Sequence, residues 1–270
     1  MNNTFSIKRF WNYFVHDLNV ARSDSGLTLA IVGALPLFQF FFAQAFSLVF
    51  QGSFITMGPM GKIPAYIVAV FIAIIFFPAK HYGVITDRRK GSDWLMLPAS
   101  SLEKWCSMLL LTCLVVPVLL FAELALTDGL LSLCFNSVYG ETAIAGIVDT
   151  MGKVWGELRT AEGGIAICWP YALYLNWCES VLFFTLGAIW FKKSKIGKTF
   201  VAGFLIMMLV SLIGTGILSA LHIQNLNMEF TEFSEAGFIR TMNIIIYSIY
   251  VVVFFVLDLL LYLRVKTLKH

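Results

Sequence analysis

The chain has 270 residues, of which 59% are hydrophobic and only 13% carry a formal charge. Soluble domains carry about 25% charged residues. Together with a mean hydropathy of +0.82, this composition excludes a soluble enzyme, a disordered chain and a nucleic-acid-binding domain. The sequence therefore predicts an all-α polytopic membrane protein whose main partner is the lipid bilayer.

Residues 1–26 are predicted to form an amphipathic helix on the cytoplasmic side. Apolar side chains recur there at helical spacing, while polar ones take the opposite face; the apolar set is Ile7, Phe10, Trp11, Phe14 and Leu18. Such a helix lies in the plane of the lipid headgroups. A soluble helix packed against the loops is the alternative.

Six apolar runs follow, each long enough to cross the roughly 30 Å hydrocarbon core of a bilayer. They cover residues 27–50, 63–79, 105–126, 170–191, 200–221 and 242–263 of a single transmembrane domain, residues 27–270. Pro36 and Pro117 lie inside the first and third runs. We expect kinks at these prolines, with neighbouring helices satisfying the carbonyl groups that proline leaves free.

The distribution of positive charge predicts the topology. With six spans both termini share one side of the membrane, and fifteen of the nineteen Lys and Arg residues fall on that side. Because basic loops stay in the cytoplasm, both termini are predicted to be cytoplasmic. The expected location is the cytoplasmic (inner) membrane of a bacterium.

Five polar side chains inside the predicted spans are candidates for function. Glu123, Glu179 and Asp258 are intramembrane acids, which are costly and often line a pathway for ions or substrates. The alternative is that each lies close enough to an interface to reach water or a partner. Gln39 and Gln44 are expected to face a helix neighbour or a cavity rather than lipid.

Motifs for catalysis and cofactor binding are absent from the sequence. The four histidines are far apart and lack carboxylates at ligand spacing, so no metal site is expected. Gly197-Lys198-Thr199 resembles the end of a phosphate-binding loop, but the required first glycine is Lys192. The chain is therefore predicted not to be an enzyme, and any ATP hydrolysis would need a separate subunit.

The loop 80–104 is the most informative segment for function. It is first basic, then apolar, and Ser100 or Ser101 followed by Glu103 predicts the start of the next helix. A short apolar patch between two spans either enters the headgroups or docks a cytoplasmic partner. The residues predicted to dock a partner are Arg88, Arg89, Trp94, Leu95, Leu97, Pro98 and Glu103.

The stretches 87–91, 94–100 and 103–104 resemble the loop between spans two and three of type-2 ABC exporter permeases. The resemblance implies a membrane subunit that forms a homodimer or heterodimer and lines the translocation route. It also implies a cytoplasmic ABC ATPase docked on the loop. The outer loop 127–166 is longer than in that family, which leaves the substrate open.

Two other functions stay open. One is an ion-coupled secondary carrier that uses Glu123, Glu179 or Asp258 as a proton site, although no inverted repeat is visible. The other is a non-transporting membrane scaffold or sensor that recruits a partner through the same loop.

Overall fold

The computed structural model describes residues 5–87, 91, 94, 96–146, 148–149, 152, 169–220 and 235–268. Within these residues the regular structure is entirely helical, and six stretches are long and apolar enough to cross a membrane. The prediction of an all-α integral membrane protein with six candidate spans is therefore confirmed. The elements are α1 (Ile7–Gly33), α2 (Leu35–Gln51), α3 (Pro59–His81), η1 (Tyr82–Thr86), α5 (Ser101–Leu109), η2 (Leu110–Val115), α6 (Val116–Cys134), α7 (Asn136–Tyr139), α9 (Trp169–Trp190), α10 (Lys195–Ala220) and α11 (Glu235–Thr267).

Helix α1 continues without a break from the predicted amphipathic segment into the first predicted span. Its buried face includes Tyr13, Asp17, Ala21 and Ser25, while Trp11 remains exposed. The N-terminal segment is thus the first part of a long helix that packs against α3, α5 and α6. Its position in the headgroup plane stays a prediction, as does the side of the membrane on which the termini lie.

The first span is interrupted where α1 meets α2. Pro36 lies in the first turn of α2, where a missing N–H costs little. Thr127 on α6 donates its hydroxyl to the carbonyl of Gly33 at 3.0 Å. A Cβ at Gly33 would lie 2.6 Å from Oε2 of Glu123, so glycine is needed for α6 to approach this closely. The break expected at Pro36 is therefore present, and a neighbouring helix stabilises it.

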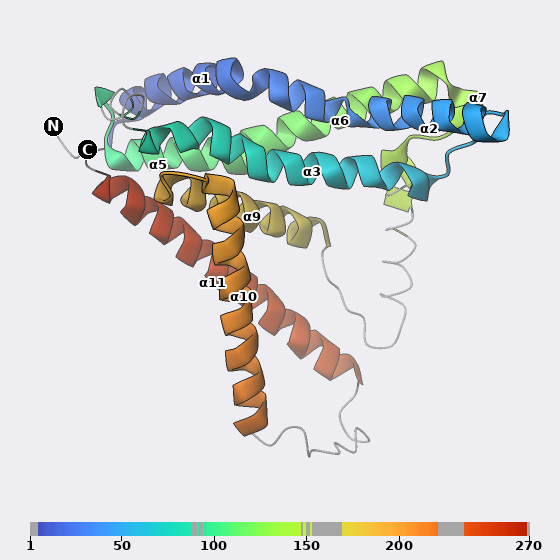
Figure 1. The fold of residues 1–270 in the computed structure, drawn as a ribbon. Helices are drawn as coiled ribbons and strands as arrows, with labels where there is room; N and C mark the ends of the chain where they lie inside the picture. The colour runs from blue at the N-terminus through green and yellow to red at the C-terminus, as the bar shows by residue number, and fades with distance from the viewer. Residues whose placement is uncertain are drawn as a thin grey trace.

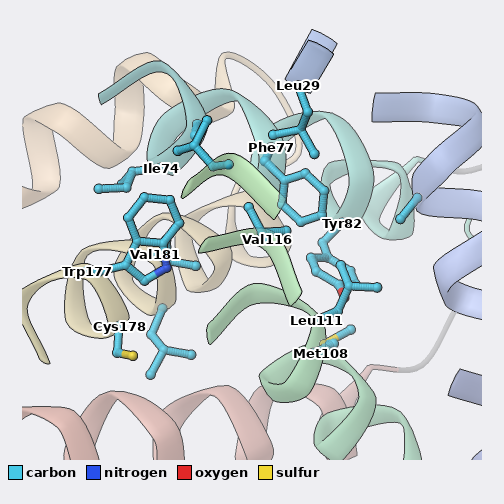
Figure 2. Packing of buried hydrophobic residues seen from close by; sticks show 14 of the residues in the cluster. Leu29, Ile74, Phe77, Tyr82, Met108, Leu111, Val116, Trp177, Cys178 and Val181 are labelled. Atoms are coloured by element: carbon cyan, nitrogen blue, oxygen red, sulfur yellow. The ribbon is translucent and has the colours of Figure 1, made fainter. Parts of the chain in front are cut away.

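The largest buried cluster joins the first four predicted spans and the sixth. Figure 2 shows its side chains meeting between α3, α6 and α9, with Leu29, Phe77, Val116 and Trp177 among them. Burial of such large apolar groups contributes about 1.5–3 kcal/mol for each side chain in a soluble protein. In a membrane the close packing itself supplies the stabilisation, because lipid is as apolar as the core.

Helix α10 and the first part of α11 leave this bundle and diverge from each other, as Figure 1 shows, while the last part of α11 packs against α9 and α5. Only 6% of the most apolar window of α10 is buried, against 44% for α9. Gly187 permits a close approach of α10, because a Cβ there would collide with the side chain of Thr199. Most of α10 is therefore free for lipid or for another membrane subunit.

The two ends of the chain lie together at one end of the bundle (Figure 1). The start of α1, the segment η1 and the start of α5 also meet there through contacts of α1 with α5 and of α3 with η1. We call this the basic end, because the segments at residues 8–22, 80–104, 192–198 and 264–269 contain most of the Lys and Arg residues.

Candidate functional site at the basic end of the bundle

The predicted docking segment, residues 80–104, lies at the basic end, and its residues differ in exposure. Arg88, Arg89 and Leu95 lie outside the described residues. Trp94 and Leu97 are half-buried and Pro98 is exposed, whereas Glu103 is fully buried. Their role in docking stays a prediction, but the segment itself is joined to several helices.

Glu103 is the main link between the docking segment and α1. Arg9 donates to both of its carboxylate oxygens, from Nη2 to Oε1 at 2.7 Å and from Nε to Oε2 at 2.8 Å. The backbone N–H groups of Ser6 and Ser100 donate to the same carboxylate at 2.9 and 2.8 Å. Glu103 also completes the capping box of α5 with Ser100, as its position in the sequence predicts. The carboxylate therefore fixes the starts of α1 and α5 to each other.

Trp94 is held by Lys104 on α5. The Lys104 ammonium donates to the Trp94 carbonyl at 2.7 Å and lies 4.4 Å from the centre of its indole ring. The Trp94 side chain also packs against the main core cluster. Trp94 is therefore partly a core residue of this chain, and Met96, which is 80% exposed, is the freer apolar group of the segment.

A third link joins the segment to α10. The Lys195 ammonium donates to the Gly83 carbonyl and lies 3.4 Å from a carboxylate oxygen of Asp87. Thr86 donates to the carbonyl of Phe191 at 3.5 Å, at the end of α9. The start of the docking segment is thus bonded to the turn between α9 and α10.

A buried polar network surrounds Asp17 beneath the segment. The carboxylate of Asp17 accepts from the Ser107 hydroxyl at 2.7 Å and lies 3.1 Å from Nε2 of His81. The Tyr82 hydroxyl donates to it at 3.4 Å. All four side chains are buried, so the network joins α1, α3, η1 and α5 by contacts that water does not weaken.

A cavity of about 530 Å³ opens beside this network. Its wall combines carboxylates and imidazoles with the aromatic rings of Tyr13, Tyr82 and Trp94. Leu97 of the docking segment also lines it. Trp94 and Leu97 of the docking segment therefore lie over a hollow rather than a solid core.

The two glutamines in the predicted spans form hydrogen bonds with backbone groups of this chain. Gln39 donates to the Gly61 carbonyl at 2.6 Å and accepts from the Ala65 N–H at 3.2 Å. Gln44 likewise forms two hydrogen bonds with Ile55: it donates to the carbonyl at 2.8 Å and accepts from the N–H at 3.2 Å. Both side chains fix the connection between α2 and α3, as expected for polar groups that face a neighbour.

The three intramembrane acids lie apart and have different surroundings. Asp258 on α11 accepts from the Trp105 indole at 3.0 Å, which joins α11 to α5. Glu123 and Glu179 are half-buried, and each has one buried oxygen that no described residue bonds. The structure thus gives Asp258 a partner within the chain and leaves the other two acids as candidates for a pathway.

Sequence reasoning missed a second polar cluster at the far end of the bundle. The fully buried Asp128 accepts from the Tyr139 hydroxyl at 2.6 Å and from the N–H groups of Ala143 and Ile144 at 3.0 and 3.1 Å. Lys62 donates to the Tyr139 carbonyl at 2.6 Å. Burial and the hydrogen bond to Asp128 raise the pKa of Tyr139. The only sequence signal for this cluster was a lone acid and a lone lysine near span ends.

Gly197-Lys198-Thr199 lies in the first turns of α10, with Thr199 buried against α9. Among the described residues no group of three His, Cys, Asp or Glu side chains could hold a metal ion. No family model, no curated protein and no solved structure matches this chain. The six apolar helices mark it as an integral membrane protein.

Proposed function

We propose that the chain is the permease subunit of an ABC-type exporter and docks a separate ATPase through residues 80–104. The observation that supports this most is the bonding of the docking segment to the helices around it. Glu103 links it to α1, Lys104 to α5, and Lys195 to α10. A docked motor could therefore move these helices.

The links of the docking segment to α1, α5 and α10 differ in strength, so a docked partner would not move these helices equally. The Arg9–Glu103 pair is bidentate and Glu103 is buried, so α1 and α5 move together. Asp87 is exposed, so its ion pair with Lys195 is weak. The turn before α10 is therefore joined to the segment mainly by the hydrogen bonds of Lys195 to the Gly83 carbonyl and of Thr86 to the Phe191 carbonyl.

The exporter needs a second membrane subunit, and α10 is the helix that would meet it. Its exposed apolar side chains extend over most of its length, from Phe200 to Ile213. The resemblance implies that spans one, two and five line the route, and α10 is the fifth. A dimer that buries α10 would place the route between the two copies.

The experiment is co-expression and co-purification with an ABC ATPase, which the proposal expects in a reading frame next to that of this chain. Met96→Glu should reduce recovery of the ATPase by about tenfold or more, because a charge replaces an exposed apolar contact. The pair Arg88→Ala and Arg89→Ala should also reduce it. Ile7→Glu is the matched control, since Ile7 is 77% exposed at the same end and outside the segment. Unchanged recovery with all three substitutions in the segment contradicts the proposal.

An ion-coupled carrier is the second candidate, and the free oxygens of Glu123 and Glu179 favour it. Proteoliposomes that contain a pH-sensitive dye distinguish the two. A proton-coupled carrier moves protons without ATP when its co-transported solute is supplied, and Glu179→Gln stops this flux. The exporter gives no such flux in either form.

A further inference from the structure

A groove of about 570 Å³ runs between α1 and α6, separate from the docking segment. Arg22 lies at one end and Glu123 at the other, and the walls between them are apolar. Ala30 and Leu119 are among the apolar wall residues. The groove is therefore cationic at the Arg22 end and apolar along its middle, and the Glu123 carboxyl group lies at its other end.

Arg22 is expected at the depth of the lipid headgroups. It precedes the first predicted span by five positions, which is about 8 Å along a helix. Its side chain is exposed, and none of the residues that the structure describes forms a hydrogen bond or ion pair with it. A free guanidinium at this depth can bind a phosphate through two parallel N–H groups.

Gly26 widens the groove directly next to Arg22. A Cβ at Gly26 would meet nothing closer than the Arg22 side chain at 3.7 Å, so no neighbouring helix requires glycine there. Glycine weakens a helix interior relative to alanine. At Gly33, by contrast, the close approach of Glu123 explains the glycine. The space at Gly26 is therefore a feature of the groove rather than of helix packing.

From the charge at one end and the apolar walls, we propose that this groove binds one anionic phospholipid. The phosphate lies on Arg22, and one acyl chain runs past Gly26 and Ala30 towards Glu123. The carboxyl group of Glu123 packs against Gly33 and closes the far end. The site does not depend on the exporter proposal, because it lies on α1 and α6 outside the docking segment.

Native mass spectrometry of the full chain tests this with phosphatidylglycerol and phosphatidylcholine that have the same acyl chains. The wild type should retain one phosphatidylglycerol per chain in preference to phosphatidylcholine. Arg22→Gln should reduce this preference by about fivefold, the value expected for one basic residue at the membrane surface. Gly26→Leu should reduce retention of both lipids, because the side chain fills the groove.

Two controls and a second filling variant keep the test decisive. Lys8→Gln removes an exposed charge at the same end, and Ala45→Leu adds the same apolar bulk on the exposed side of α2, so both should retain lipid normally. Ala30→Leu replaces Gly26→Leu if that variant does not elute as a folded protein. An unchanged preference in Arg22→Gln, wild-type retention in the filled variants, or retention that never saturates would each overturn the proposal.

Discussion

The Trp177 indole donates to the carbonyl of Thr112 at 3.2 Å, and Pro117 cannot donate a hydrogen bond to this carbonyl. Residues Leu110–Val115 form a π-helical turn, in which each carbonyl bonds the N–H five positions later. For Thr112 that position is Pro117, which has no N–H. Tyr174, one turn earlier on α9, donates to the next carbonyl, that of Cys113, at 2.9 Å. Helix α9 therefore completes the hydrogen bonding of the third span.

This relationship predicts that Trp177→Phe destabilises the protein and that Pro117→Ala offsets part of the loss. Removing the indole N–H leaves a buried carbonyl without a donor, which costs about 1–3 kcal/mol. Alanine at position 117 restores a backbone N–H. Unfolding in an SDS titration measures both, with Trp11→Phe as the control because Trp11 is 59% exposed. Equal losses with and without Pro117→Ala would mean that packing, not the hydrogen bond, explains the effect.

Glu103→Gln should destabilise the basic end. The substitution keeps the shape but removes the charge that Arg9 and two backbone N–H groups share, and each charge-assisted bond is worth about 1.5–3 kcal/mol. The SDS midpoint should fall, and proteolysis of the N-terminal segment should become faster. Glu141→Gln is the control, because the Glu141 side chain is exposed. An unchanged proteolysis rate would show that the carboxylate does not hold α1.

The Asp17 network predicts that two substitutions are not additive. Ser107→Ala should cost about 1.5–3 kcal/mol in unfolding free energy, since it removes one hydrogen bond from a buried carboxylate. Combined with Asp17→Asn, the cost of Ser107→Ala should shrink, because its charged partner is gone. Full additivity in the double-mutant cycle would mean that the 2.7 Å contact contributes nothing.

The purified chain should neither bind nor hydrolyse ATP. Lys198 lies in a helical turn without the glycine-rich wrap that phosphates require, and its side chain is exposed. Lys198→Ala should therefore leave equilibrium dialysis with labelled ATP at background. One ATP bound per chain in the absence of a partner would contradict the conclusion that Gly197-Lys198-Thr199 is not a phosphate-binding loop. It would also contradict the exporter proposal.

The apolar runs predicted the six candidate spans, because span length and hydropathy are local properties of the chain. The capping box at Ser100 and Glu103 and the disturbed helix at Pro117 were local signals too. The continuity of α1 was not predicted, because nothing in residues 22–27 marks a helix end or its absence. The partners of Glu103 and Lys62 could not be predicted either. Arg9 is 94 positions away from Glu103 in the sequence, and Lys62 and Tyr139 are 77 positions apart.

Site-specific photo-crosslinking is the most direct test of whether residues 80–104 touch an ABC ATPase. A photoreactive amino acid at position 96 should form a covalent adduct with the co-expressed ATPase, because Met96 is 80% exposed beside the half-buried Trp94. The same probe at position 7, which is 77% exposed at the same end, should not. If the ATPase docks on residues 80–104, an ATPase adduct forms from position 96 alone. Adducts from both positions, or from neither while the ATPase is present in the membrane, would contradict it.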